Sequence, residues 1–244
     1  MTPYTFDQRP DLREEMAAVA PRVWSPFMLE DAYGARYWNA LYTVFPEYQS
    51  TFLGDEGKVV ANAFCVPFYW DGKLRNLPPG WDEVIAWGFA DKAAGRKPNT
   101  LSALAAEIVP EWQGRGLSAE PLKQMRRVAQ AHGLTSMVAP VRPTRKGDYP
   151  HMSIEEYAYL TRDDGLPVDH WMRVHARLGA EVIKVAPKSM YVPGTVAEWE
   201  EWTGMEFPES GEYVVPGALQ PVKIDREADL GEYWDPNVWM RHTV

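Results

Sequence analysis

The sequence predicts a mixed α/β fold, because segments with helical periodicity alternate along the chain with short apolar segments typical of strands. A chain of 244 residues is long enough to bury a core of its own. No internal repeat or low-complexity linker divides it. We therefore expect one domain over 1–192, with an insert at about 72–99, and an extension over 193–244 that packs on the same domain.

The first half of the chain contains helical stripes, β-rich segments and one irregular segment. Tyr33, Tyr37, Leu41 and Val44 recur at helical spacing. The segment before Thr100 is rich in proline and glycine, so we expect it to leave the sheet and act as a lid. The predicted order is two helices, a strand pair, the irregular segment and a strand: 12–24, 31–45, 50–55 with 58–72, 74–99 and 100–110.

The second half continues the alternation of helices and strands. Pro121 falls in the first turn of a predicted helix that Gly133 closes. Ser153 with Glu156, and Thr195 with Glu198, form capping boxes that predict two more helix starts. The expected elements are a helix, a short buried strand, a helix, a helix with its following strand, and a helix: 118–133, 134–143, 153–160, 168–185 and 195–204. Residues 211–225 and 233–242 suggest a strand and an aromatic tail.

Composition and charge exclude several classes of protein. The net charge of −9 argues against a nucleic-acid binder and against an anionic membrane surface. No stretch approaches the roughly 18 apolar residues that span a bilayer, and the N-terminal segment does not resemble a secretory signal. Cys65 is the single cysteine, so no internal disulfide or cysteine-based zinc site is expected, which fits a cytoplasmic protein.

A glycine-rich turn stands between the strand that ends at Pro110 and the helix that follows. Backbone N–H groups of such a turn, together with the helix N-terminus, can bind an anion. The segment 111–146 is locally basic, which favours an anion over a plain turn. The turn is not a Walker loop, because no Gly-Lys-Ser/Thr follows, and the dinucleotide motif fails at Ala119.

The turn has the sequence Gln-Gly-Arg-Gly-Leu-Ser at 113–118. It resembles the acetyl-CoA motif of the GNAT superfamily of N-acetyltransferases, Gln/Arg-x-x-Gly-x-Gly/Ala. Ser118 stands where the family has Gly or Ala. The resemblance implies a mostly antiparallel mixed sheet flanked by helices, acetyl-CoA as cosubstrate and no metal. It also implies that the strand end pairs with the pantetheine arm and the loop binds the pyrophosphate, through Ile108, Val109, Gln113, Gly114, Arg115, Gly116, Leu117 and Ser118.

Two residues are candidates for acid–base chemistry. Glu107 lies in the strand before the loop, and an apolar environment there would raise its pKa and suit it to accept a proton from an amine. The alternative is a strand-end glutamate that reaches solvent or pairs with an arginine. The helix end His-x-x-x-Gly-Ala at 175–180 resembles a family motif with tyrosine as general acid. His175 would take that position with an ordinary pKa near 6.5, unless it is a core histidine.

We therefore predict an enzyme, a CoA-dependent N-acyltransferase that transfers acetyl from acetyl-CoA to a small amine, with a homodimer left open. The acidic surface favours a cationic acceptor, and a peptide or protein N-terminus is left open as the acceptor. The alternative is a GNAT-like module that binds acyl-CoA without turnover. That alternative is motivated by the extension and by Val168 and Trp171, which stand where the family has an Asn and a small residue. Thioester decarboxylation on the same scaffold has no specific residue behind it.

Overall fold

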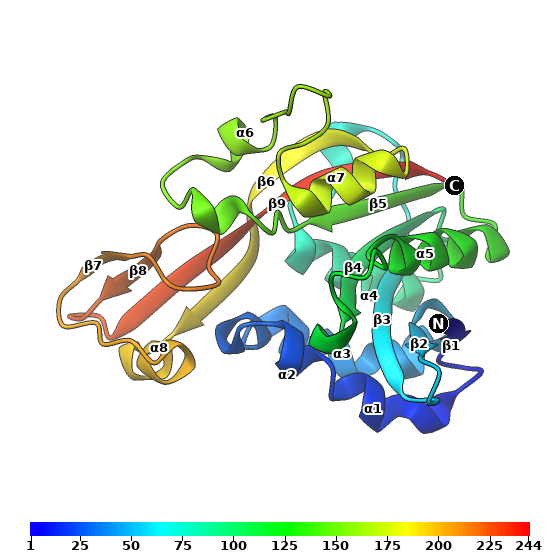
Figure 1. Ribbon diagram of the computed structural model, residues 1–244, viewed down its shortest axis with the longest axis horizontal. Helices are drawn as coiled ribbons and strands as arrows, with labels where there is room; N and C mark the ends of the chain where they lie inside the picture. The colour runs from blue at the N-terminus through cyan, green and yellow to red at the C-terminus, as the bar shows by residue number, and fades with distance from the viewer.

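The computed structural model describes residues 1–244, and its centre is one nine-stranded sheet. The strand order is β1-β2-β3-β4-β5-β9-β8-β7, and β6 pairs with the other edge of β9 (Figure 1). All pairings are antiparallel except that of β4 with β5. The mixed, mostly antiparallel sheet predicted from the sequence is confirmed. The strands are β1 (Thr2–Thr5), β2 (Ser50–Leu53), β3 (Val59–Phe68), β4 (Thr100–Ile108), β5 (Ser136–Val141), β6 (Glu181–Gly194), β7 (Gly211–Tyr213), β8 (Val222–Asp225) and β9 (Leu230–Thr243).

Helices cover both faces of the sheet. On one face, β3 presents Asn62, Phe64 and Val66 to α1, α3 and α4, while α5 packs on the opposite face of β3 and β4. None of these helices combines the length and the hydrophobicity that a membrane-spanning helix needs. The helices are α1 (Arg13–Ala17), α2 (Ala20–Val23), α3 (Ala32–Val44), α4 (Trp81–Ala93), α5 (Ala119–Ala131), α6 (Ile154–Tyr157), α7 (His170–Arg177) and α8 (Val196–Thr203).

Local signals located several helix ends correctly. The capping boxes that begin α6 and α8 are both formed, with Ser153 and Thr195 as N-caps. Pro121 lies in the first turn of α5, and Gly133 follows its end with a φ of +66°. Ser118 is different, because its side chain makes no capping hydrogen bond although it precedes α5.

The expectation of a lid at 74–99 is wrong. This segment holds α4, a 13-residue helix that packs against β3. The contact is close at Gly88, where an added Cβ would clash with the Val66 side chain. Glycine therefore lets the helix approach the sheet, and the Pro and Gly residues around α4 form only its connections.

The prediction of an aromatic tail at 233–242 is also wrong. These residues belong to β9, a 14-residue strand that pairs with β5 along one half and with β6 along its length. Its buried Trp239 and Tyr233 are part of the core. The sheet is therefore not complete at residue 192, and the C-terminal segment supplies its central strand together with the β7–β8 hairpin.

The two parallel strands separate soon after they begin. β4 pairs with β5 only from Thr100 to Ser102, opposite Ser136 to Val138. Beyond that point the two strands diverge, and the edge of β4 that faces β5 has no partner strand. The sheet is thus split at its middle, and this split positions the site described next.

Candidate active site

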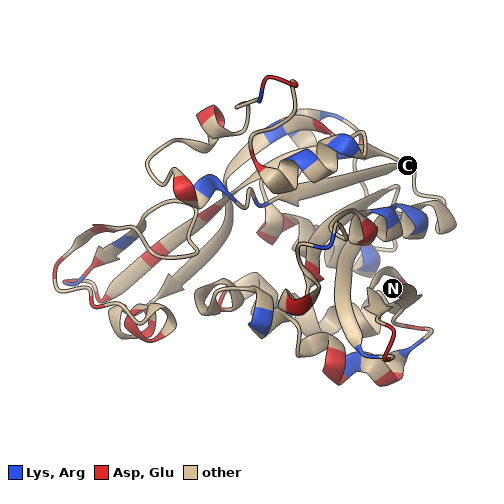
Figure 2. Ribbon diagram, in the orientation of Figure 1, with Lys and Arg blue, Asp and Glu red and all other residues tan.

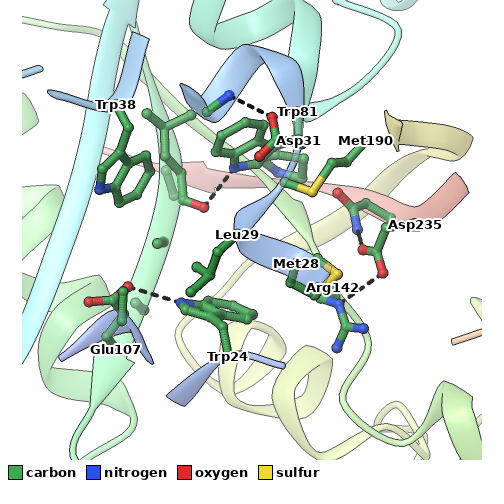
Figure 3. Close-up of a pocket in the computed structure, with 18 of the residues that line it drawn as sticks. Trp24, Met28, Leu29, Asp31, Trp38, Trp81, Glu107, Arg142, Met190 and Asp235 are labelled. Atoms are coloured by element: carbon green, nitrogen blue, oxygen red, sulfur yellow. Dashed lines mark hydrogen bonds and ion pairs between the residues drawn. The ribbon is translucent and has the colours of Figure 1, made fainter. Parts of the chain in front are cut away.

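A cavity of about 370 Å³ lies in the split between β4 and β5 (Figure 3). Its floor includes residues 103–107 of β4 and 139–142 at the end of β5. The N-terminal helices and α7 supply its walls, which are mostly hydrophobic. Five aromatic side chains line it: Trp24, Trp38, Tyr42, Trp81 and Trp171. A few charged groups in such surroundings are well placed to orient a ligand.

Glu107 lines this cavity and is 1% exposed. Its carboxylate accepts hydrogen bonds from Trp24 Nε1 at 2.9 Å and from Asn62 Nδ2 at 3.1 Å. Burial raises the pKa of Glu107, although the two hydrogen bonds oppose the shift. The alternative of a strand-end glutamate in solvent does not apply, and no cation pairs with this carboxylate.

His175 also lines the cavity, with its ring edge-to-face against Trp171. Its Nδ1 lies 2.9 Å from Nε2 of His242, and its own Nε2 has no hydrogen-bond partner. Burial, and then the neighbouring His242, lower the pKa of His175 well below its usual range. The expected titration near pH 7 is therefore corrected: His175 is neutral at that pH because its charged form would be desolvated.

An ion pair closes one side of the cavity. Arg142 Nε lies 2.9 Å from Asp235, and the same carboxylate accepts hydrogen bonds from Tyr233 and Asn237. The network continues from Asn237 to Ser189, whose hydroxyl accepts the N–H of Trp81. Asp235 is thus neutralised by Arg142 and accepts hydrogen bonds from three side chains.

Asp31 is a third carboxylate in the cavity wall, and it is 3% exposed. It caps α3 by accepting the N–H of Gly34, and it forms no ion pair. Burial raises its pKa to about 6. The cavity therefore contains two carboxyl groups, Asp31 and Glu107, whose partners are all neutral donors.

The glycine-rich loop joins β4 to α5 and is exposed from Gln113 to Gly116. Gly114 and Gly116 have φ angles of +71° and +75°, which L side chains rarely adopt. None of the backbone N–H groups from Gly114 to Ala119 makes a hydrogen bond within the chain. This run of free donors at the start of α5 fits the phosphate groups of coenzyme A.

Among the other residues predicted to contact coenzyme A, some backbone groups already form hydrogen bonds within the chain and others do not. Val109 donates its N–H to Val60, so that N–H is not free to pair with a coenzyme arm, and its carbonyl already accepts the N–H of Trp112. This corrects the expectation for Val109 as far as its N–H is concerned. By the alternation of an antiparallel pair, the N–H of Ile108 faces the open edge of β4. Gln113 bonds the Ile108 carbonyl through Nε2 at 2.8 Å and so holds the loop.

The basic segment 111–146 does not form one patch. Lys146 is buried and donates to two backbone carbonyls, and Arg142 belongs to the ion pair in the cavity. Basic side chains do gather along α5, which follows the loop, and along α7, which contacts α5 (Figure 2). Arg115 in the loop itself lies over the Trp112 ring, 5.1 Å from its centroid.

The two residues that seemed to obstruct the site lie in different places. Val168 precedes α7, outside the helix, and it does not line the cavity. Trp171 is in the first turn of α7 and contributes to the cavity wall beside His175. The departure at Val168 therefore has no consequence for the cavity.

Comparison with known proteins gives one curated relative and several similar folds. "Arginine N-acetyltransferase avaD" of Aspergillus versicolor is 30% identical over an alignment of length 271, gaps included, which covers 98% of this chain and 93% of the relative. The loading GNATL domain of CurA from Lyngbya majuscula has a TM-score of 0.65 at 18% identity, covering 99% of this chain and 96% of that one. A GNAT-like decarboxylase, GphF in complex with isobutyryl-CoA, has a TM-score of 0.59 at 13% identity, covering 100% and 99%. No protein-family model matches the chain.

The split sheet, the glycine loop and the relative together define an N-acyltransferase. The chain belongs to the GNAT superfamily of N-acetyltransferases, and it is an enzyme of that class. These comparisons favour the predicted acyltransferase over a module that only binds ligand. The two structural neighbours support the fold alone, since their identities are below one fifth.

Sequence reasoning missed several residues of the site. The sequence indicated Asp31 only as the first residue of a predicted helix and Trp24 only as the last residue of the preceding one. It indicated Asp235 only as part of the aromatic tail. One local signal was available for Asp31, because Asp before a helical stripe is a typical N-cap. Nothing in the sequence indicated that this cap also faces a cavity with Glu107.

Proposed function

We propose that the enzyme transfers an acetyl group from acetyl-CoA to an amine nitrogen of arginine or a closely related cationic amine. The observation that carries the proposal is the pair of cavity carboxyls, Asp31 and Glu107, without any cationic partner. A ligand with two positive groups would complement them. The activity named for the fungal relative supports the same acceptor.

Coenzyme A is assigned to the loop and to the open edge of β4. The free N–H groups from Gly114 to Ala119 would hold its phosphates, and the N–H of Ile108 would pair with the arm. The reacting thioester would then lie in the split between the strands, beside Glu107. Gln113 acts indirectly in this proposal, since its side chain braces the loop.

Glu107 is proposed as the general base. The acceptor enters as an ammonium and must lose a proton before its nitrogen can attack the thioester carbonyl. A carboxylate with a raised pKa is a suitable proton acceptor, and Trp24 and Asn62 fix its orientation. The ammonium gives one proton to Glu107, and its nitrogen then forms the C–N bond as the C–S bond breaks. The second proton that the nitrogen loses passes through solvent to the departing thiolate, which leaves as the CoA thiol.

His175 is proposed to act as a neutral donor to the departing sulfur. In the tautomer in which His242 donates to Nδ1 of His175, the unpartnered Nε2 carries the hydrogen. It would stabilise the thiolate by a hydrogen bond without becoming an imidazolium. A neutral donor is consistent with the lowered pKa of His175, whereas a positively charged acid is not.

The α-amine is the more reactive nitrogen of arginine because it loses its proton more easily than the guanidinium. An α-amino group has a pKa of about 8 and a guanidinium one of about 12.5 or more, so the α-amine is deprotonated at far lower cost. A base such as Glu107 can accept a proton from the α-ammonium group much more readily than from the guanidinium. We therefore assign acetylation to the α-amine.

The test is thiol release from acetyl-CoA with arginine, lysine, agmatine and an uncharged amine as acceptors, with the product's acetyl position read by tandem mass spectrometry. We expect release with arginine and an α-N-acetyl product. Glu107→Gln should lower kcat about 100-fold while acetyl-CoA binding by calorimetry is unchanged. Binding of acetyl-CoA without release for any amine would refute the proposed acceptor class. Conversion of malonyl-CoA to acetyl-CoA and CO2 without an amine would identify a decarboxylase instead.

A further inference from the structure

Asp31 is the one carboxylate of the cavity that has no side-chain hydrogen-bond partner. Asp235 is occupied by Arg142, Tyr233 and Asn237. Glu107 has a donor on each of its two oxygens. Asp31 has only backbone donors of its own helix start, chiefly the N–H of Gly34.

The surroundings of Asp31 do not provide it with a positive charge. The nearest charged groups that act on it are acidic: Glu30 raises its pKa, and Asp31 in turn raises that of the buried Asp82. A buried carboxylate with no countercharge weakens the folded state. A ligand that brings a cation into the cavity would supply the missing charge.

The walls next to Asp31 suit a flat cation. Figure 3 places Asp31 beside Trp81 and Met190, in a different part of the cavity from Glu107. Trp81 is held by a hydrogen bond from Nε1 to the Leu104 carbonyl at 2.9 Å, and its ring stacks on Trp38. A guanidinium is planar and weakly hydrated, so it stacks on an indole while it binds a carboxylate.

We infer that Asp31 is a specificity-determining residue that binds the guanidinium of the acceptor, with Trp81 beside it. The inference rests on the proposed function. With the guanidinium at Asp31, the α-amine is the group left to approach Glu107. The site therefore selects arginine over citrulline, which keeps the length and the α-amine but replaces the guanidinium with a neutral urea.

The experiment compares arginine with citrulline in the wild type and in Asp31→Asn. Asparagine remains a good N-cap for α3, so the fold should be retained, and a thermal melt verifies this. Glu30→Gln is the matched control, because it removes the same charge from an adjacent, exposed position outside the cavity. Steady-state KM and kcat are measured for both acceptors at pH 8.

Asp31→Asn should raise KM for arginine about 10- to 100-fold, the usual loss for a charge-assisted hydrogen bond, with a small change in kcat. The preference for arginine over citrulline should nearly disappear in this variant and persist in Glu30→Gln. A preference retained in Asp31→Asn, or lost equally in Glu30→Gln, overturns the inference while the proposed function stands. Absence of arginine turnover in the wild type, with acetyl-CoA bound, overturns both.

Discussion

Replacing Asp31 with asparagine should make the folded protein more stable at pH 8, although the residue is a helix cap. Its pKa is raised from 3.8 to about 6, because burial penalises the charged form. A shift of about two pKa units corresponds to roughly 3 kcal/mol. The cavity is open to solvent, so we expect about 1–2 kcal/mol after allowing for screening.

The sign of the effect follows from proton binding. The folded state holds the Asp31 proton more tightly than the unfolded state, so stability falls as pH rises from about 4 to 6. Above pH 6 the penalty is fully present, and asparagine removes it. Near pH 4 the folded carboxyl is already neutral, so wild type and variant should be almost equally stable there.

Thermal denaturation of both proteins at pH 8, 6 and 4 measures this difference. For a chain of this size the gain at pH 8 should appear as a rise in Tm of about 2–8 °C. Glu30→Gln should change little at any pH, because Glu30 is exposed. Lower stability of Asp31→Asn at pH 8, or an equal gain at pH 4 and pH 8, would refute the reasoning. It would mean that the cap, and not the buried charge, dominates at this position.

Three further predictions concern the loop, the base and the buried histidine. Gly116→Val should weaken CoA binding by calorimetry more than tenfold, because a β-branched residue cannot hold a φ of +75° without strain. Trp24→Phe removes a donor that lowers the pKa of Glu107, so the acidic limb of the kcat/KM profile should move to higher pH. Below pH 6.5 His175 binds a proton in the unfolded state but stays neutral in the folded state, so the Tm of the wild type should fall with pH. His175→Asn should make this decrease in Tm smaller.

Each of these has a control or a contradicting outcome. Gly95→Val introduces the same strain, at a φ of +66°, in the turn after α4, and it should leave CoA binding intact. An unshifted pH profile in Trp24→Phe would remove Glu107 from the role of base. Exposed His151→Asn should melt like the wild type across the same pH range, and equal behaviour of His175→Asn would contradict the lowered pKa.

Much of the local architecture could be predicted from the sequence because the relevant forces are local. Capping boxes act within four residues, and the glycines of the loop need no partner to favour a positive φ. The loop and α5 were therefore recognisable from residues 113–133, and this segment together with the helix end at 175–180 indicated the superfamily. Glu107 was singled out because it adjoins that loop.

The acceptor side of the site could not be predicted in this way, because it depends on contacts between distant segments. Asp31, Glu107 and Asp235 come from three separate parts of the chain, and no spacing relates them. The pairing of Arg142 with Asp235 exists only because β9 inserts between β5 and β6. Sequence by itself determined the class of protein through short-range backbone geometry. Tertiary structure decided which carboxylates stay unpaired, since burial and ion pairing are set only when the strands assemble.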